Sequence, residues 1–194
     1  MAGHFEATPG GGASVVLDEV EIAILRSLAV QLLELIGPGD EPAEGADPLA
    51  ALFAEGPSEP PADPALARLF PDAYGTDDSE LRAASAEFRR FTENDLRARK
   101  RVDALAVVRT LDALKADGDG EAVLELDADG SRSWLGTLND LRLTIGTRLE
   151  VSEEDGGDPG SLYRLPDSDP RKPMVMAFLW LGALQETLVE TLMP

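Results

Sequence analysis

The sequence contains no cysteine and only one histidine. Without thiols, these residues can form no disulfide, thiolate zinc site, iron–sulfur cluster or cysteine redox switch. The histidine, His4, lies in a glycine-rich start, where we expect no fixed position of the kind that acid–base catalysis needs. We therefore expect no metal site and no cofactor.

Long hydrophobic runs are also missing. The longest apolar stretch, Met174–Leu184, is shorter than the roughly 20 residues that cross a membrane as a helix. The N-terminus lacks the basic start and apolar run of a signal peptide. We expect a cytoplasmic protein with no membrane contact.

Positive charge is scarce. The chain has 17 Lys and Arg residues against 37 Asp and Glu residues, a net charge of −20. Such a surface repels nucleic-acid phosphates and favours basic partners. The 194 residues, 43% of them hydrophobic, suffice for one globular domain with its own core.

Apolar residues recur at spacings of three and four, which predicts helices. We expect an all-α fold, with about five helices in one orthogonal or bundle-like domain joined by acidic linkers. The expected helices cover residues 17–36, 79–115, 131–149 and 173–192, with short pieces at 48–53 and 64–70. In the first, Asp18 and Glu21 resemble a capping box. The apolar residues expected to form one stripe of this helix are Leu17, Val20, Ile24, Leu28, Leu32 and Leu35.

The remaining segments are expected to be irregular. Residues 1–13 read as a disordered tail, and residues 14–194 as a single helical domain that includes an acidic Pro-rich connector at 37–78 and an acidic loop at 151–170. Val123–Leu126 alternates in polarity, but one short run cannot build a sheet. We interpret it as extended chain or as the lead-in to a helix.

No catalytic motif is present. Gly10–Gly12 lacks the Lys-Ser/Thr pair of a phosphate-binding loop, and no Gly-x-Ser-x-Gly motif occurs. The carboxylates lie mostly in linkers, without a sign of a shielded pocket. The sequence predicts a non-enzymatic protein, and a deep pocket with convergent polar groups would favour a small-ligand enzyme instead.

A basic segment interrupts the acidic chain. Residues 82–109 hold eight basic residues against four acidic ones, a local charge of +4, and a helix break near Thr92 is predicted within it. The predicted partner- or nucleic-acid-binding residues are Arg89, Arg90, Arg97, Arg99, Lys100 and Arg101. The alternative is that these cations pair with the protein's own excess carboxylates.

A second polar cluster lies on the helix expected at 131–149. Its members are Trp134, Asn139, Asp140, Arg142 and Arg148, beside an apolar face of Trp134, Leu138, Leu141, Ile145 and Leu149. As a structural network, Asp140 or Asn139 would hold an arginine bidentately across a helix pair. The alternative is a partner-binding site.

The segment Trp134–Leu149 resembles the signature of an actinobacterial family of oxidative stress transcriptional regulators, the AosR-like proteins, formerly catalogued as a domain of unknown function. Residues 63–74, 87–93 and 184–189 are similar to the same family. The resemblance implies a transcriptional regulator of oxidative-stress and sulfur-metabolism genes. It would act through a sigma factor and RNA polymerase, or through promoter DNA.

Two features qualify that implication. The family's redox switch uses an N-terminal cysteine pair, which this sequence lacks, so the switch is not carried over. Family genes also neighbour that of a Clp protease adaptor, which leaves an alternative role as a protein-binding adaptor of Clp proteolysis without DNA contact. We also expect a homodimer through the last helix, because Met174, Met176, Phe178 and Trp180 exceed what one helix face needs.

Overall fold

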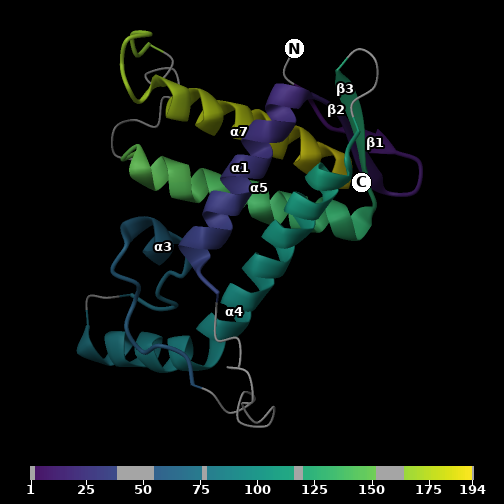
Figure 1. Cartoon of the computed structure of the whole chain (residues 1–194). Coiled ribbons are helices and arrows are strands. Elements are labelled where there is room, and N and C mark those ends of the chain that lie inside the picture. Colours follow the sequence, from purple (N-terminus) through teal and green to yellow (C-terminus); the bar gives the residue numbers. More distant parts are fainter. Residues whose placement is uncertain (1–2, 39–54, 76–77, 116–119, 152–163, 194) are drawn as a thin grey trace.

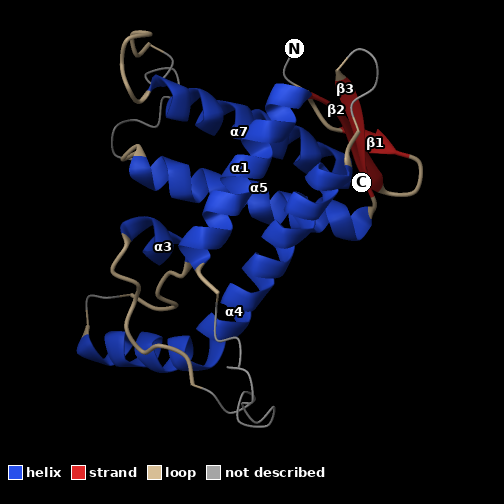
Figure 2. Cartoon of the chain, viewed as in Figure 1, coloured by secondary structure: helices blue, strands red, loops and turns tan. Residues whose placement is uncertain are grey.

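The computed structural model describes residues 3–38, 55–75, 78–115, 120–151 and 164–193. Helices dominate it, and a small sheet lies at one side (Figures 1 and 2). In chain order the elements are β1 Glu6–Thr8, β2 Gly12–Asp18, α1 Glu19–Ile36, α3 Pro64–Leu69, α4 Ser79–Ala113, β3 Glu121–Leu126, α5 Ala128–Arg148 and α7 Lys172–Leu192. The short helix predicted at 48–53 lies outside the described residues.

The expectation of an all-α fold is wrong, because β1, β2 and β3 form an antiparallel sheet in that order. Strand β2 pairs with β3 from Ala13↔Leu126 to Asp18↔Glu121, and with β1 through Ala7↔Ala13. The predicted disordered tail at 1–13 therefore contains β1 and the start of β2. Val123–Leu126 forms a strand because it pairs with β2. The local sequence could not show this pairing, since β2 lies more than 100 residues earlier in the chain.

The three consecutive glycines, Gly10–Gly12, allow the tight turn between β1 and β2. Gly10 and Gly11 have φ angles of 112° and 85°, which glycine adopts without steric cost. At Gly12, a Cβ would lie 2.1 Å from the Leu126 carbonyl oxygen of β3. Three glycines thus permit a tight hairpin whose second strand packs closely on its neighbour.

Helix α1 begins as predicted but buries a different face. The Asp18 carboxylate accepts from the Glu21 N–H at 2.7 Å, and the Glu21 carboxylate accepts from the Asp18 N–H at 3.1 Å, a complete capping box. The buried residues are Leu25, Ala29, Leu32 and Ile36. The predicted stripe is wrong at its start: Leu17 belongs to β2, and Val20 and Ile24 are exposed.

Helix α5 lies at the centre of the domain. It packs against α1, α3, α4, α7, β2 and β3. Its predicted apolar face is confirmed: Trp134, Leu138, Leu141, Ile145 and Leu149 are all buried. Helix α7 turns Val175, Leu181, Leu184 and Leu188 into the same core. By length and composition alone α7 could also cross a membrane.

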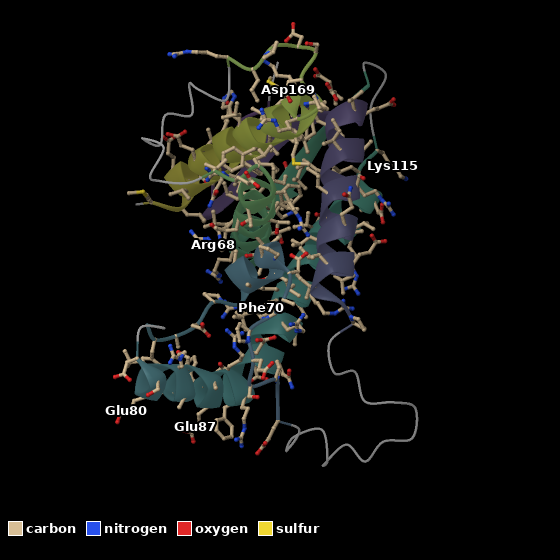
Figure 3. All side chains as sticks on the ribbon, turned by 90° about the vertical axis from the view of Figure 1, so that its left-hand side faces the viewer. Arg68, Phe70, Glu80, Glu87, Lys115 and Asp169 are labelled. Carbon is tan, nitrogen blue, oxygen red and sulfur yellow. The ribbon has the colours of Figure 1, made fainter. Side chains whose placement is uncertain are left out.

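Helix α4 is continuous over 35 residues but changes direction part-way along (Figure 1). Its second half packs on α1 and α5, whereas its first half projects from the body and carries Glu80 and Glu87 outward (Figure 3). The helix break predicted near Thr92 is not found. Instead the Thr92 hydroxyl donates to the Phe88 carbonyl at 2.8 Å, a contact that often bends helices. We call residues 79–92 the α4 arm.

Replacing Phe5 with alanine tests whether the N-terminal residues belong to the core. The Phe5 ring is buried edge-on against Trp134, with centroids 6.0 Å apart. Loss of this ring should lower the free energy of unfolding by about 3 kcal/mol, measured by urea denaturation. Val16→Ala, on the exposed face of β2, should change it by less than about 0.5 kcal/mol. Equal effects of the two changes would show that Phe5 is not a core residue.

Candidate functional site

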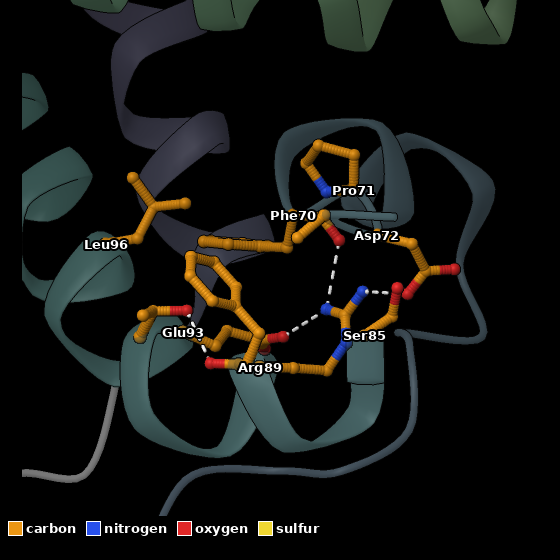
Figure 4. Close-up of a pocket in the computed structure, with 10 residues that line it drawn as sticks. Phe70, Pro71, Asp72, Ser85, Arg89, Glu93 and Leu96 are labelled. Atoms are coloured by element: carbon orange, nitrogen blue, oxygen red, sulfur yellow. Dashed lines mark hydrogen bonds and ion pairs between the residues drawn. The ribbon is translucent and has the colours of Figure 1, made fainter. Parts of the chain in front are cut away.

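Arg89 is the centre of a buried ion-pair cluster where α4 meets the connector. Only 4% of its surface is exposed. It donates to Glu93, to the Asp72 carboxylate at 2.9 Å and to the Phe70 carbonyl at 3.0 Å (Figure 4). Burial lowers the pKa of Arg89, but the hydrogen bonds to Asp72 and Glu93 outweigh burial and raise that pKa above its ordinary value. Arg89 is therefore a structural cation.

Arg97 and Arg101 bind backbone carbonyls at the C-terminal end of α1. Arg97 donates to the Ile36 carbonyl and Arg101 to the Gly37 carbonyl. Carbonyls at a helix C-terminus lack helical partners and carry partial negative charge, so cations are stabilising there. Arg97 also pairs with Glu93 at 2.6 Å and lies 4.3 Å above the Phe70 ring. Both arginines thus hold α1 against α4.

Lys100 joins α4 to the central helix. Its Nζ lies 2.6 Å from the Asp140 carboxylate, which is buried on α5. Burial raises the pKa of Asp140, and Lys100 offsets part of that effect. The predicted arginine on Asp140 or Asn139 is wrong, since Asp140 takes a lysine and Asn139 accepts from the Gln185 amide at 3.4 Å.

The rest of the motif on α5 also contacts neighbouring elements. Trp134 Nε1 donates to Thr110 Oγ1 on α4 at 3.1 Å. Arg142 donates to Gln185 on α7 at 2.6 Å and stacks 5.3 Å from the Phe178 ring. Arg148 pairs with Asp63, the N-cap of α3, at 2.7 Å. One helix therefore carries polar links to α4, α7 and α3, which supports the structural interpretation of this motif.

Two of the predicted binding residues remain at the surface. Arg90 is partly exposed, pairs with Glu55 at 2.8 Å and lies 5.4 Å from the Phe91 ring. Arg99 is exposed and makes no hydrogen bond or ion pair with the residues that the structure describes. The predicted binding residues thus do not assemble into one cationic surface. Most of this positive charge is used inside the protein.

A groove lies above the ion-pair cluster, between α4 and residues 70–73. Its cavity has a volume of about 210 Å³. It is lined by Phe70, Pro71, Asp72, Ala73, Ser85, Phe88, Arg89, Thr92, Glu93 and Leu96 (Figure 4). We call it the α4 groove. Its walls are apolar and open, because Phe88 is 48% exposed and Leu96 39% exposed.

Sequence reasoning missed the α4 groove because the apolar spacing of Leu81, Phe88 and Phe91 does not show whether these side chains are buried or exposed. All three are exposed on the α4 arm. One feature of the sequence could have indicated their exposure. These large apolar residues lie on a highly charged helix segment, and no helix was predicted to cover them.

The size of the groove restricts what it can bind. Small-molecule pockets usually measure about 300–1,000 Å³, so this cavity suits a single large apolar side chain better than a substrate or cofactor. The floor charges of Arg89 and Glu93 already satisfy each other. Within the described parts of the chain, no group of three or more His, Asp or Glu side chains could hold a metal ion. The arrangement fits a protein-binding groove.

Comparison with known proteins places the chain in a family. The model of the family named "Domain of unknown function (DUF2017)" matches residues 2–192. The chain belongs to this family. It is 30% identical over 184 residues to the proteins named oxidative stress regulator AosR of Mycobacterium tuberculosis and Mycobacterium bovis, which covers 89% of this chain and 78% of each relative. No solved structure matches it.

The same identity extends to the putative oxidative stress regulator AosR of Mycobacterium leprae, of which 79% is covered. The resemblance seen in the sequence is thereby confirmed, and the names of these relatives support a regulatory role for the DUF2017 chain. The match extends over both the structural motif on α5 and the residues of the α4 groove.

Lys100→Met and Arg99→Met form a matched pair that separates internal from surface charge. Loss of Lys100 leaves the Asp140 carboxylate buried without its cation, which should cost about 3 kcal/mol of unfolding free energy near pH 7. Loss of the exposed Arg99 should cost less than about 0.5 kcal/mol. Urea denaturation measures both.

The loss of unfolding free energy caused by Lys100→Met should become smaller as the pH falls. A carboxyl group with a raised pKa binds its proton more tightly in the folded state, so protonation of Asp140 favours folding as the pH falls. A loss in Lys100→Met that stays constant down to about pH 4 would contradict this account of the pair.

Proposed function

We propose that this protein is a non-enzymatic regulator of oxidative-stress and sulfur-metabolism genes. It binds a sigma factor, in the cytoplasm, through the α4 groove. The regulatory part of the proposal is supported by the similarity to proteins named oxidative stress regulator. The sigma factor is the partner that the family resemblance implies. The single observation that carries the choice of surface is an open apolar groove on a helix whose cations are mostly paired internally.

The distribution of charge favours a protein partner over promoter DNA. Affinity for DNA comes largely from several exposed Lys and Arg residues that neutralise phosphates. Here Arg89, Arg97, Lys100 and Arg101 hold carboxylates or helix carbonyls inside the fold. The net charge of −20 adds repulsion from phosphate. Of the six predicted binding residues, Arg90 and Arg99 remain at the surface of the described structure.

The α4 groove has the features of an anchor site in a protein interface. Interfaces gain most of their binding energy where a few large side chains enter desolvated pockets. A cavity of about 210 Å³ accepts one such side chain, and Leu81, Tyr74 and Phe91 extend the exposed apolar area around it. An amphipathic helix of the sigma factor would supply the anchor and lie along the α4 arm.

Affinity capture from the native cell lysate, followed by mass spectrometry, tests this function. The groove variant is Phe88→Glu with Leu96→Glu, which places charge on two exposed walls. The control is Val123→Glu, because Val123 is an exposed apolar residue on the outer face of β3. We expect wild type and the control to capture a sigma factor or RNA polymerase, and the groove variant to capture at least tenfold less.

Other outcomes identify the alternatives. Capture of Clp components in place of a sigma factor would favour the proteolysis adaptor. A salt-dependent affinity for promoter DNA, unchanged in the groove variant, would contradict the choice of protein over DNA. Charge reversal at Arg97, Lys100 and Arg101 is a poor probe, since those residues hold α1 and α5 and their loss would unfold the protein. Circular dichroism confirms that each tested variant is folded.

A further inference from the structure

Helix α7 has an outward face that the domain core covers only in part. Its outward residues recur alternately every three and four positions, the repeat of a helix that pairs with another helix. They are Met176, Leu179, Ala183, Glu186, Glu190 and Met193. Met176 is 48% exposed and Ala183 is exposed, while Leu179 is half-buried. Leu181, Leu184 and Leu188 are buried on the opposite side.

The charges along α7 change sign from one end to the other. Arg171 and Lys172 stand at its beginning, and Glu186 and Glu190 near its end. No charged residue occurs from Pro173 to Gln185. In a chain of net charge −20, most surfaces repel a second copy. This face offers a neutral centre flanked by opposite charges.

We propose that a second copy of this chain covers the outward face of α7, with the two α7 helices antiparallel and the two-fold axis beside Leu179. A two-fold interface uses the same surface on both chains, so each contact occurs twice. Met176 then lies opposite Ala183 of the partner subunit. Ala183 lets the helices approach closely, and the flexible thioether of Met176 fills the space that its methyl group leaves.

Charge complementarity selects the antiparallel arrangement. It brings the basic start of each α7 within a turn of the acidic end of the other, so that Arg171 approaches Glu186 of the partner subunit. Arg171 can reach across because its side chain is 59% exposed although it pairs with Asp169. A parallel pair would set Glu186 and Glu190 against their own copies, which like-charge repulsion disfavours.

The dimer face is separate from the α4 groove. Helix α7 and the α4 arm lie at opposite ends of the molecule (Figure 1). Pairing through α7 therefore leaves both grooves open, and a dimer would present two of them. The dimer does not depend on the proposed function, and either can fail alone.

The absence of cysteine makes this geometry directly testable. Leu179→Cys places a single thiol beside the axis, where mild oxidation should join the two chains in a disulfide dimer on a non-reducing gel. Met193→Cys lies on the same outward stripe, but the two copies of residue 193 would be about 40 Å apart in the antiparallel pair and should remain unlinked. Efficient linkage through residue 193, and none through 179, would overturn the antiparallel model.

Light scattering at micromolar concentration gives an independent readout. Wild type should show twice the chain mass of 20.7 kDa. Ala183→Glu should reduce the mass to that of one chain with an unchanged circular dichroism spectrum, whereas Val123→Glu should remain a dimer. Glu186→Lys should weaken the dimer at least tenfold, and addition of Arg171→Glu should restore it. A wild-type mass of one chain, or a dimer insensitive to Ala183→Glu, would overturn the proposal.

Discussion

Burial of one face of α5 is the constraint on which the rest of the structure depends. Trp134, Leu138, Leu141, Ile145 and Leu149 lose their contact with water together, and each such side chain contributes roughly 1.5–3 kcal/mol when fully buried. The sheet, α1, α3, α4 and α7 each pack against part of α5. Contact with α5 therefore restricts where each of these elements can lie. The α4 groove and the outward face of α7 are surfaces of two of these neighbouring helices that do not pack against α5.

Scarcity of positive charge explains how the protein uses its arginines and lysines. With 17 cations for 37 carboxylates, acidic partners are plentiful, and Arg89, Arg97 and Lys100 each pair with one. Buried pairs such as Arg89–Glu93 add little net stability, since desolvation offsets much of their attraction, but removing one partner is costly. Their effect is positional: they attach the connector and the end of α1 to α4. Several exposed apolar residues, among them Phe88 and Phe91, remain on the α4 arm.

The match to the DUF2017 family spans α5, the helix that holds the fold together. The polar links of Trp134, Asp140, Arg142 and Arg148 all connect α5 to other elements. These links hold the fold together. The proposed function rests on a different feature, the apolar α4 groove at the surface.

Local rules were sufficient for much of the helical structure. The capping box of Asp18, the N-cap Asp63 before Pro64 and the apolar face of α5 were all predictable, because each depends on residues within a few positions of one another. The charge excess of residues 82–109 was equally visible, and so was the sign of the whole chain. Neither observation could show which carboxylates those cations would meet.

Tertiary structure alone decided the sheet, the buried face of α1 and the destination of the basic residues. A strand of six residues is stable only when a partner is present, and β3 finds its partner near the N-terminus, where Leu17 also satisfies the helical spacing. Phe88 and Phe91 are exposed because no helix among the described residues covers the α4 arm. The sequence by itself therefore determined helix propensity, capping and net charge, which act over short distances. Packing between distant segments determined which side chains became core, ion pair or binding surface.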